Sequence, residues 1–130
     1  MCLEITVSIA PDAKGRISAD RLSTLTGLAV SSCKVDGAPA LHFAVTGGCS
    51  CEFLSDDADF EAESWALAAE HLPALARAIK VLSSECRRFS LLAHWLDGER
   101  PIRTEGISGA ALTRLVEENR LGNNVVYVAK

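Results

Sequence analysis

The sequence predicts an α+β protein in which helices pack on a mostly antiparallel sheet. Short segments alternate apolar and polar residues, one long segment repeats its apolar residues every three or four positions, and turn signals join neighbouring strands. A chain of 130 residues with 48% hydrophobic content is expected to form a single two-layer domain over residues 1–130. Such a core needs no disulfide or metal.

The N-terminal segment is expected to form a strand followed by a short helix. Leu3–Ile9 alternates apolar and polar residues, which is typical of a strand with one buried face. After a turn, Ser18 predicts the N-cap of a helix that runs to Leu25, and Gly27 predicts its C-terminal stop.

A meander of three strands is expected next. Residues 28–35, 40–46 and 49–54 are its predicted strands. Asp36–Pro39 is expected to be a four-residue loop between the first two. Gly47-Gly48 is expected to be a two-residue turn before the third, because paired glycines suit the positive φ angles of such turns.

The longest helix is expected over about residues 61–86. Acidic residues open this segment and basic residues close it, as the helix dipole favours. Pro73 predicts a kink or a break, and the apolar stripe keeps its phase through Pro73, which favours the kink. The stripe consists of Trp65, Ala68, Leu72, Leu75, Ile79, Leu82, Cys86 and Phe89.

The C-terminal part is expected to add two or three strands and one helix. Residues 88–96 are a predicted strand, and residues 101–104 are a predicted short edge strand. Ser108 is expected to cap a helix that stops at Gly122, and residues 125–128 are expected to close the chain as a strand.

Charge and hydropathy narrow the class of partner. The net charge is −4 and the basic residues are scattered, so no nucleic acid is expected as a partner. No apolar run reaches the ~20 residues of a membrane helix, and the N-terminus does not resemble a secretory signal. We therefore expect a cytoplasmic protein whose five cysteines stay reduced.

No catalytic motif is present in the sequence. It has no metal-binding HExxH, no GxSxG elbow, no phosphate-binding loop and no GxGxxG turn, so no catalytic residue is assigned and no cofactor is expected. The acidic run 57–63 resembles a calcium loop, but it lacks the glycine and the terminal glutamate that such a loop requires. We expect no tight calcium binding there.

The nearest approach to a chemical signature is Gly47-Gly48-Cys49-Ser50-Cys51. With the loops predicted above, Cys33, His42, Cys49 and Cys51 project from the same face of the meander. They are the candidate ligands of a site for zinc or copper. The alternative is that a helix covers this face and the thiols only pack there.

Two hypotheses about function follow from the sequence. The first is a binding or protein-interaction module with a protein or small-molecule partner, because a folded body carries no catalytic signature. The second is a thiol-based metal-binding or redox site around Cys49 and Cys51.

Overall fold

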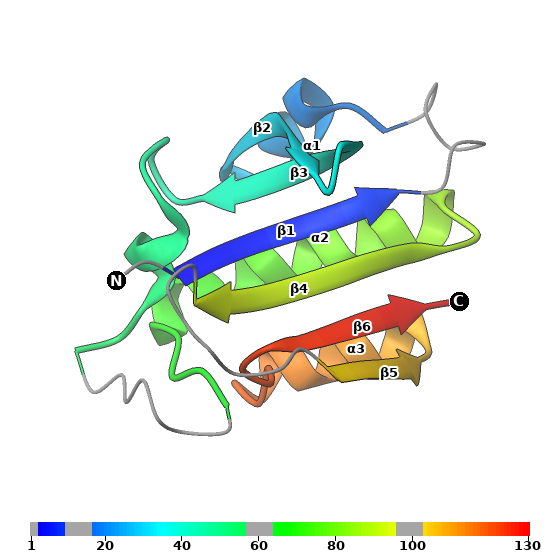
Figure 1. Ribbon diagram of the computed structural model, residues 1–130. Helices are drawn as coiled ribbons and strands as arrows, with labels where there is room; N and C mark the ends of the chain where they lie inside the picture. The colour runs from blue at the N-terminus through cyan, green and yellow to red at the C-terminus, as the bar shows by residue number, and fades with distance from the viewer. Residues whose placement is uncertain (1–2, 10–16, 57–63, 96–102) are drawn as a thin grey trace.

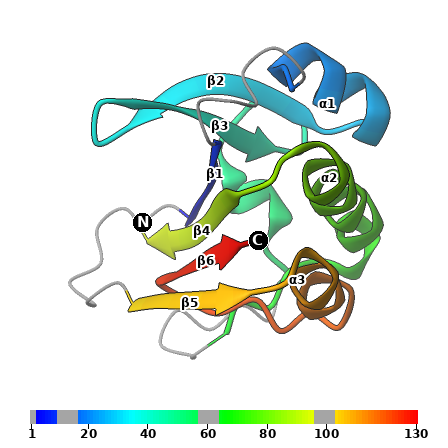
Figure 2. The same ribbon diagram turned by 90° about the vertical axis from the view of Figure 1, so that its right-hand side faces the viewer.

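The computed structural model contains one six-stranded sheet with three α-helices on one of its faces (Figure 1, Figure 2). It describes residues 3–9, 17–56, 64–95 and 103–130. The strands are β1 Leu3–Ile9, β2 Ala29–Val35, β3 Ala38–Ala44, β4 Phe89–Trp95, β5 Arg103–Ile107 and β6 Val125–Ala129. The helices are α1 Ala19–Thr26, α2 Leu72–Glu85 and α3 Gly109–Glu117, with 3-10 turns η2 Ser50–Phe53 and η3 Ala69–His71.

The sheet has the strand order β2-β3-β1-β4-β6-β5. All neighbouring strands are antiparallel except β5 and β6, which run parallel and are connected through α3. Figure 2 shows α1, α2 and α3 on the same side of the sheet. The predicted α+β class, with a mostly antiparallel sheet and helices packed on it, is confirmed.

Three of the predicted helix caps, Ser18, Gly27 and Ser108, are confirmed, whereas the predicted stop at Gly122 is wrong because α3 ends at Glu117 with Glu118 as its C-cap. The Ser18 side chain accepts the N–H of Arg21 at 3.1 Å, and Ser108 accepts the N–H of Ala111 at the same distance. Gly27 ends α1 with φ of 78°, a left-handed conformation that glycine adopts without a steric penalty.

The long helix begins later than the sequence predicts. The turn η3 runs directly into α2, so the joined helix covers residues 69–85. Residues 64–68 are not helical, because the Trp65 N–H donates to the Leu121 carbonyl and the Ala68 N–H donates to the Phe53 carbonyl. Pro73 lies in the first turn of α2, where its missing N–H leaves no hydrogen bond unmade. The helix changes from 3-10 to α next to Pro73, in place of a kink in its middle.

The meander differs from the prediction at both of its turns. The β2–β3 loop has two residues, Asp36 and Gly37, with φ of 50° and 79°, and Val35 pairs with Ala38. The predicted four-residue loop is therefore wrong. The predicted strand over residues 49–54 is also wrong, since this segment contains the 3-10 turn η2.

The core lies between the sheet and the helices. Ile5 and Val7 of β1, Leu91 of β4 and Ile79 and Leu82 of α2 are each 0% exposed. The apolar stripe of α2 thus packs toward the sheet, as its helical spacing predicts.

The two edges of the sheet differ in their protection. At the β2 edge, the Ser23 hydroxyl of α1 accepts the Val30 N–H at 2.9 Å and donates to the Val30 carbonyl at 3.4 Å. At the β5 edge, the parallel register turns the backbone groups of Thr104 and Gly106 away from β6. Both of these residues are exposed.

Two further sequence predictions concern calcium binding and membrane spans. The acidic run 57–63, where no calcium site is expected, lies outside the described residues. Within the described ranges, no helix combines the length and the apolar character that a membrane span requires.

Candidate functional site

The described helices cover one face of the sheet and leave its opposite face without a helix (Figure 2). We call it the open face. Its residues alternate along the strands with the core residues, and the cross-strand register aligns them in rows. They are Ala29, Ser31, Cys33 and Val35 of β2, Ala38, Ala40, His42 and Ala44 of β3, Glu4, Thr6 and Ser8 of β1, Ser90, Leu92 and His94 of β4, Val126 and Val128 of β6, and Thr104 and Gly106 of β5.

Formal charge is almost missing from the described residues of the open face. Glu4 is the only Asp, Glu, Lys or Arg among its residues, although such residues make up 23% of the chain. The outer surface of the helices, by contrast, carries the ion pair between Lys80 and Glu117 and the pair between Arg21 and Glu85. Depletion of charge distinguishes the centre of protein interfaces from ordinary surface.

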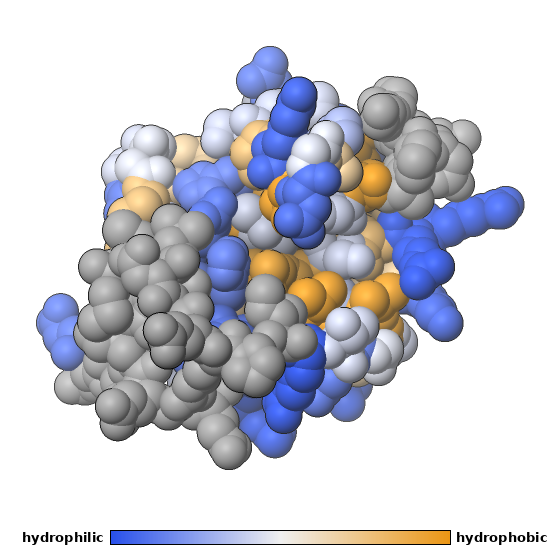
Figure 3. Space-filling view, viewed as in Figure 1, coloured by the Kyte–Doolittle hydropathy of each residue, from blue (hydrophilic) through white to orange (hydrophobic). Residues whose placement is uncertain are grey.

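Apolar side chains gather on the part of the open face formed by β4 and β6. Leu92 pairs directly with Val126, and Val128 lies two residues further along β6. All three are half-buried. Figure 3 looks onto this face and shows hydrophobic residues grouped over β4 and β6, with residues of intermediate and hydrophilic character beside them. We call Leu92, Val126 and Val128 the apolar patch.

One acid and one histidine lie beside the patch. Glu4 is the direct cross-strand partner of His94, yet within the described residues no hydrogen bond or ion pair joins these two side chains. Burial, together with the negative charge of Glu4, raises the pKa of the Cys33 thiol on the same face. The thiol of Cys33 is therefore less readily ionised than an ordinary cysteine.

The structure brings together only part of the predicted metal site. Cys33 and His42 share the open face, but Cys33 pairs with Ala40 and His42 pairs with Ser31, so the predicted direct opposition of Cys33 and His42 is wrong. Cys49 is exposed in the loop before η2, and Cys51 lies inside η2. Across the described ranges, no three His, Cys, Asp or Glu side chains are placed to hold one metal ion.

Ser50, between these two cysteines, connects the ends of β1 and β3. It is 0% exposed. Its hydroxyl accepts the Ile5 N–H at 3.0 Å, donates to the Phe43 carbonyl and lies 3.3 Å from Nε2 of His42. Because its proton goes to a carbonyl and solvent does not reach it, Ser50 does not have the exposed, base-activated hydroxyl of a nucleophilic serine. Its role is to bridge two strands.

The residues on either side of Ser50 fix the same loop. The Cys51 sulfur accepts the Leu3 N–H at 3.0 Å. The Glu52 carboxylate accepts the Gly48 N–H at 3.0 Å and the Thr46 N–H at 3.2 Å, and it also accepts the Thr46 hydroxyl. The hydrogen bond from the Thr46 side chain is the main cause that lowers the pKa of Glu52.

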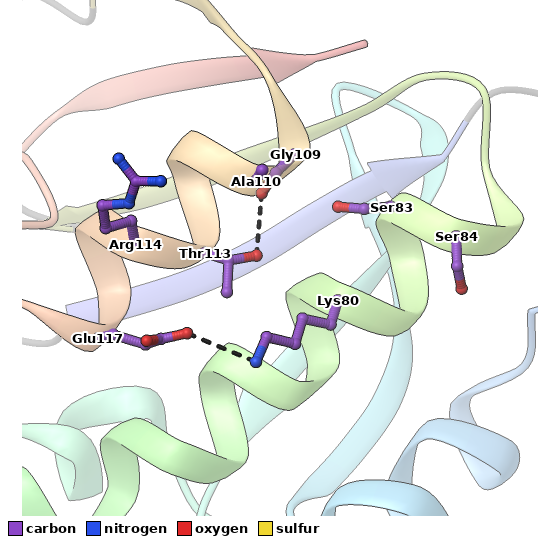
Figure 4. A pocket seen from close by; sticks show the side chains of 8 residues that line it. All are labelled: Lys80, Ser83, Ser84, Gly109, Ala110, Thr113, Arg114 and Glu117. Carbon is purple, nitrogen blue, oxygen red and sulfur yellow. Dashed lines mark hydrogen bonds and ion pairs between the residues drawn. The ribbon is translucent and has the colours of Figure 1, made fainter.

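A second surface feature is the groove between α2 and α3 on the helical side (Figure 4). Two adjoining hollows of about 550 and 480 Å³ share Lys80 and Glu117, whose side chains lie 3.6 Å apart. One hollow has the start of α3, Ser83 and Arg114 in its wall, and Figure 4 shows Arg114 pointing away from the Lys80–Glu117 pair. The hollow beside Ser83 and Arg114 is lined mainly by polar side chains, whereas the other hollow is lined mainly by the apolar residues Ala69, Leu72, Pro73 and Ala76.

Sequence reasoning missed the apolar patch, although the sequence contains a signal for it. Residues 125–129 are Val-Val-Tyr-Val-Ala, which is apolar at every position. A strand with one solvated face alternates apolar and polar residues, whereas a continuous apolar run is typical of a strand covered on both faces. Val126 and Val128 are the residues that this signal identifies.

Comparisons of the chain with protein-family models, with curated proteins and with solved structures found no match. The geometry of the open face is therefore the main guide to function.

Proposed function

We propose that this chain is a protein-binding domain that receives its partner on the open face. The observation that carries the proposal is the apolar patch, which lies on a sheet face without Lys or Arg and opposite the layer of helices. Exposed apolar patches rimmed by polar residues mark interaction sites in soluble proteins.

The chemistry of the open face favours protein over other partners. A nucleic acid needs lysine or arginine side chains to neutralise phosphates, and the strand residues described on the open face include neither. Small molecules favour concave sites, whereas the patch Leu92, Val126 and Val128 lies on the broad face of a sheet.

The proposal predicts a contact at Val126 that site-specific photo-crosslinking detects. A photoreactive amino acid at Val126 is expected to give a light-dependent adduct with a protein that mass spectrometry identifies. The matched control is Leu25, which is 39% exposed on α1, in the helical layer. Adducts at both positions, or at neither, would contradict the proposal.

The second candidate is a thiol-based metal or redox site at Cys49 and Cys51. It is favoured by one observation, the 3.0 Å hydrogen bond from the Leu3 N–H to the Cys51 sulfur, which is shorter than the 4.0 Å bond that the thiol donates to the Leu3 carbonyl, since a donor to sulfur stabilises a thiolate. Metal analysis together with thiol counting on purified protein tests it. Bound zinc or copper that is lost in Cys51→Ser supports this candidate, and metal-free protein with independently reacting thiols removes it.

A further inference from the structure

We propose that the partner on the open face is a second copy of this chain, so that two sheets pack face to face in a two-fold symmetric dimer. This inference rests on the proposed function and names its partner. It is argued from the size of the face, from its small side chains and from the position of its single charge.

The size of the open face suits a pair of sheets. Six strands about 4.8 Å apart, each five to seven residues long at about 3.3 Å per residue, give a surface of about 24 by 20 Å. Two copies would cover at most roughly 1,000 Å², the lower limit of a specific interface, because Thr6, Ala40 and Ala44 of this face are already buried within one chain. We therefore expect a reversible dimer that depends on protein concentration.

The side chains of the open face are short. Ala40, Ser8 and Ser90 form one row across three neighbouring strands, and Thr6 lies in the next row between His42 and Leu92. Short side chains let two sheets approach to the usual spacing of about 10 Å with their strands nearly aligned. Long charged side chains would hold the sheets apart, and among the described residues of this face only Glu4 is charged.

The position of Glu4 favours an identical partner. A two-fold axis along the strands between β1 and β4 lays β1 of one copy over β4 of the other. The register of β1 and β4 puts Glu4 beside His94, so the same axis puts each Glu4 over the partner's His94. The carboxylate and the imidazole, which make no hydrogen bond with each other within one chain, gain a partner across the interface.

The first experiment measures mass against concentration for the purified full chain by analytical ultracentrifugation. A dimer that dissociates on dilution is expected. Leu92→Glu puts a carboxylate at the centre of the interface in both copies, and it is expected to weaken association by about a hundredfold or more. The control Leu25→Glu adds the same charge in the helical layer and is expected to leave association unchanged.

The second experiment tests the contact between Glu4 and His94 by mixing two variants. Glu4→Lys and His94→Glu are each expected to dimerise poorly, because Glu4→Lys removes the carboxylate that faces His94 and His94→Glu places two glutamates opposite each other. Their mixture is expected to form a heterodimer, since the introduced lysine of one copy then meets the introduced glutamate of the other. Circular dichroism on each variant checks that the fold is kept. If either variant unfolds, Glu4→Gln replaces the mixing experiment and is expected to weaken the homodimer, and unchanged association of Glu4→Gln would overturn the contact.

The outcomes separate this inference from the proposed function. A monomer at every concentration overturns the second copy as partner, and crosslinking at Val126 to a different protein would then leave the proposed function standing. A dimer that Leu92→Glu does not weaken overturns the face-to-face arrangement. Monomeric protein without any adduct at Val126 overturns both.

Discussion

Replacement of Ser50 by alanine separates hydrogen bonding from packing at the junction of β1 and β3. Alanine has nearly the volume of serine, so the change leaves little cavity, but it removes the hydroxyl that joins the Ile5 N–H to the Phe43 carbonyl. Ser50 is 0% exposed, so water does not replace it. A buried polar group without a partner costs about 1–3 kcal/mol. With two such groups, we expect Ser50→Ala to lower the free energy of unfolding by about 2–4 kcal/mol.

Urea denaturation followed by circular dichroism measures this loss. The melting temperature is expected to fall by roughly 10 °C, given the size of the chain. Ser84→Ala is the control, because Ser84 is exposed and its hydroxyl donates to the Val81 carbonyl of its own helix. A loss of under half a kcal/mol in Ser50→Ala, about the effect of an ordinary surface substitution, would refute the bridging role.

Further predictions concern the core, a loop and the thiols. Ile79→Ala is expected to cost about 2–5 kcal/mol in urea denaturation, because Ile79 is 0% exposed; a loss below about half a kcal/mol would place its stripe on the surface. Asn119→Ala is expected to cost at least about 1 kcal/mol, because the Asn119 amide bonds both backbone groups of Leu67 and its φ is 57°; an unchanged denaturation midpoint would contradict this. The pKa of Glu52 is lower in the folded state, so its stabilisation is present above the ordinary pKa of a glutamate and is lost as pH falls through the lowered value. The stability difference between wild type and Glu52→Gln should therefore shrink in acid, and a difference that is constant with pH would count against it. Cys49 is expected to alkylate faster than Cys33 at neutral pH, because Cys49 is exposed and the pKa of Cys33 is raised; peptide mass spectrometry gives the two rates, and the reverse order would contradict the assignment.

Local signals in the sequence predict most of the elements because their causes are local. Ser18, Gly27 and Ser108 end or begin helices through hydrogen bonds and dihedral angles of their own neighbourhood. The alternation of Leu3–Ile9 reflects the burial of one face, which a period of two reports directly.

Errors arise where a contact distant in sequence decides the conformation. Trp65 fits the helical stripe by spacing, yet its N–H bonds the Leu121 carbonyl and its indole bonds the Ala93 carbonyl. Spacing alone contains no information about either partner. In the same way, the turn η2 forms where the Ser50 hydroxyl bonds the backbone of Ile5 and Phe43. The glycine pair before η2 contains no information about these distant partners.

The hairpin at Asp36-Gly37 is mispredicted because a proline at residue 39 favours a loop over a strand. Pro39 instead pairs with Lys34, next to the pair of Val35 and Ala38 that closes the turn. The pairing of β1 with β3 reaches only to Ala40, so no ladder bond requires an N–H at residue 39. The predicted register is therefore wrong by two residues, and Cys33 lies opposite Ala40 and not opposite His42. The predicted metal site required Cys33 and His42 to lie opposite each other.

The unequal edges of the sheet limit how the sheet can grow. The Ser23 hydroxyl already bonds the outward N–H and carbonyl of Val30. A strand added along β2 therefore cannot form a continuous row of backbone hydrogen bonds. Thr104 and Gly106 present their backbone groups outward along β5. Strand addition is therefore favoured at one edge only. If two copies joined through β5, both available edges would be used at once, and the assembly would close as a pair without extending into a fibre.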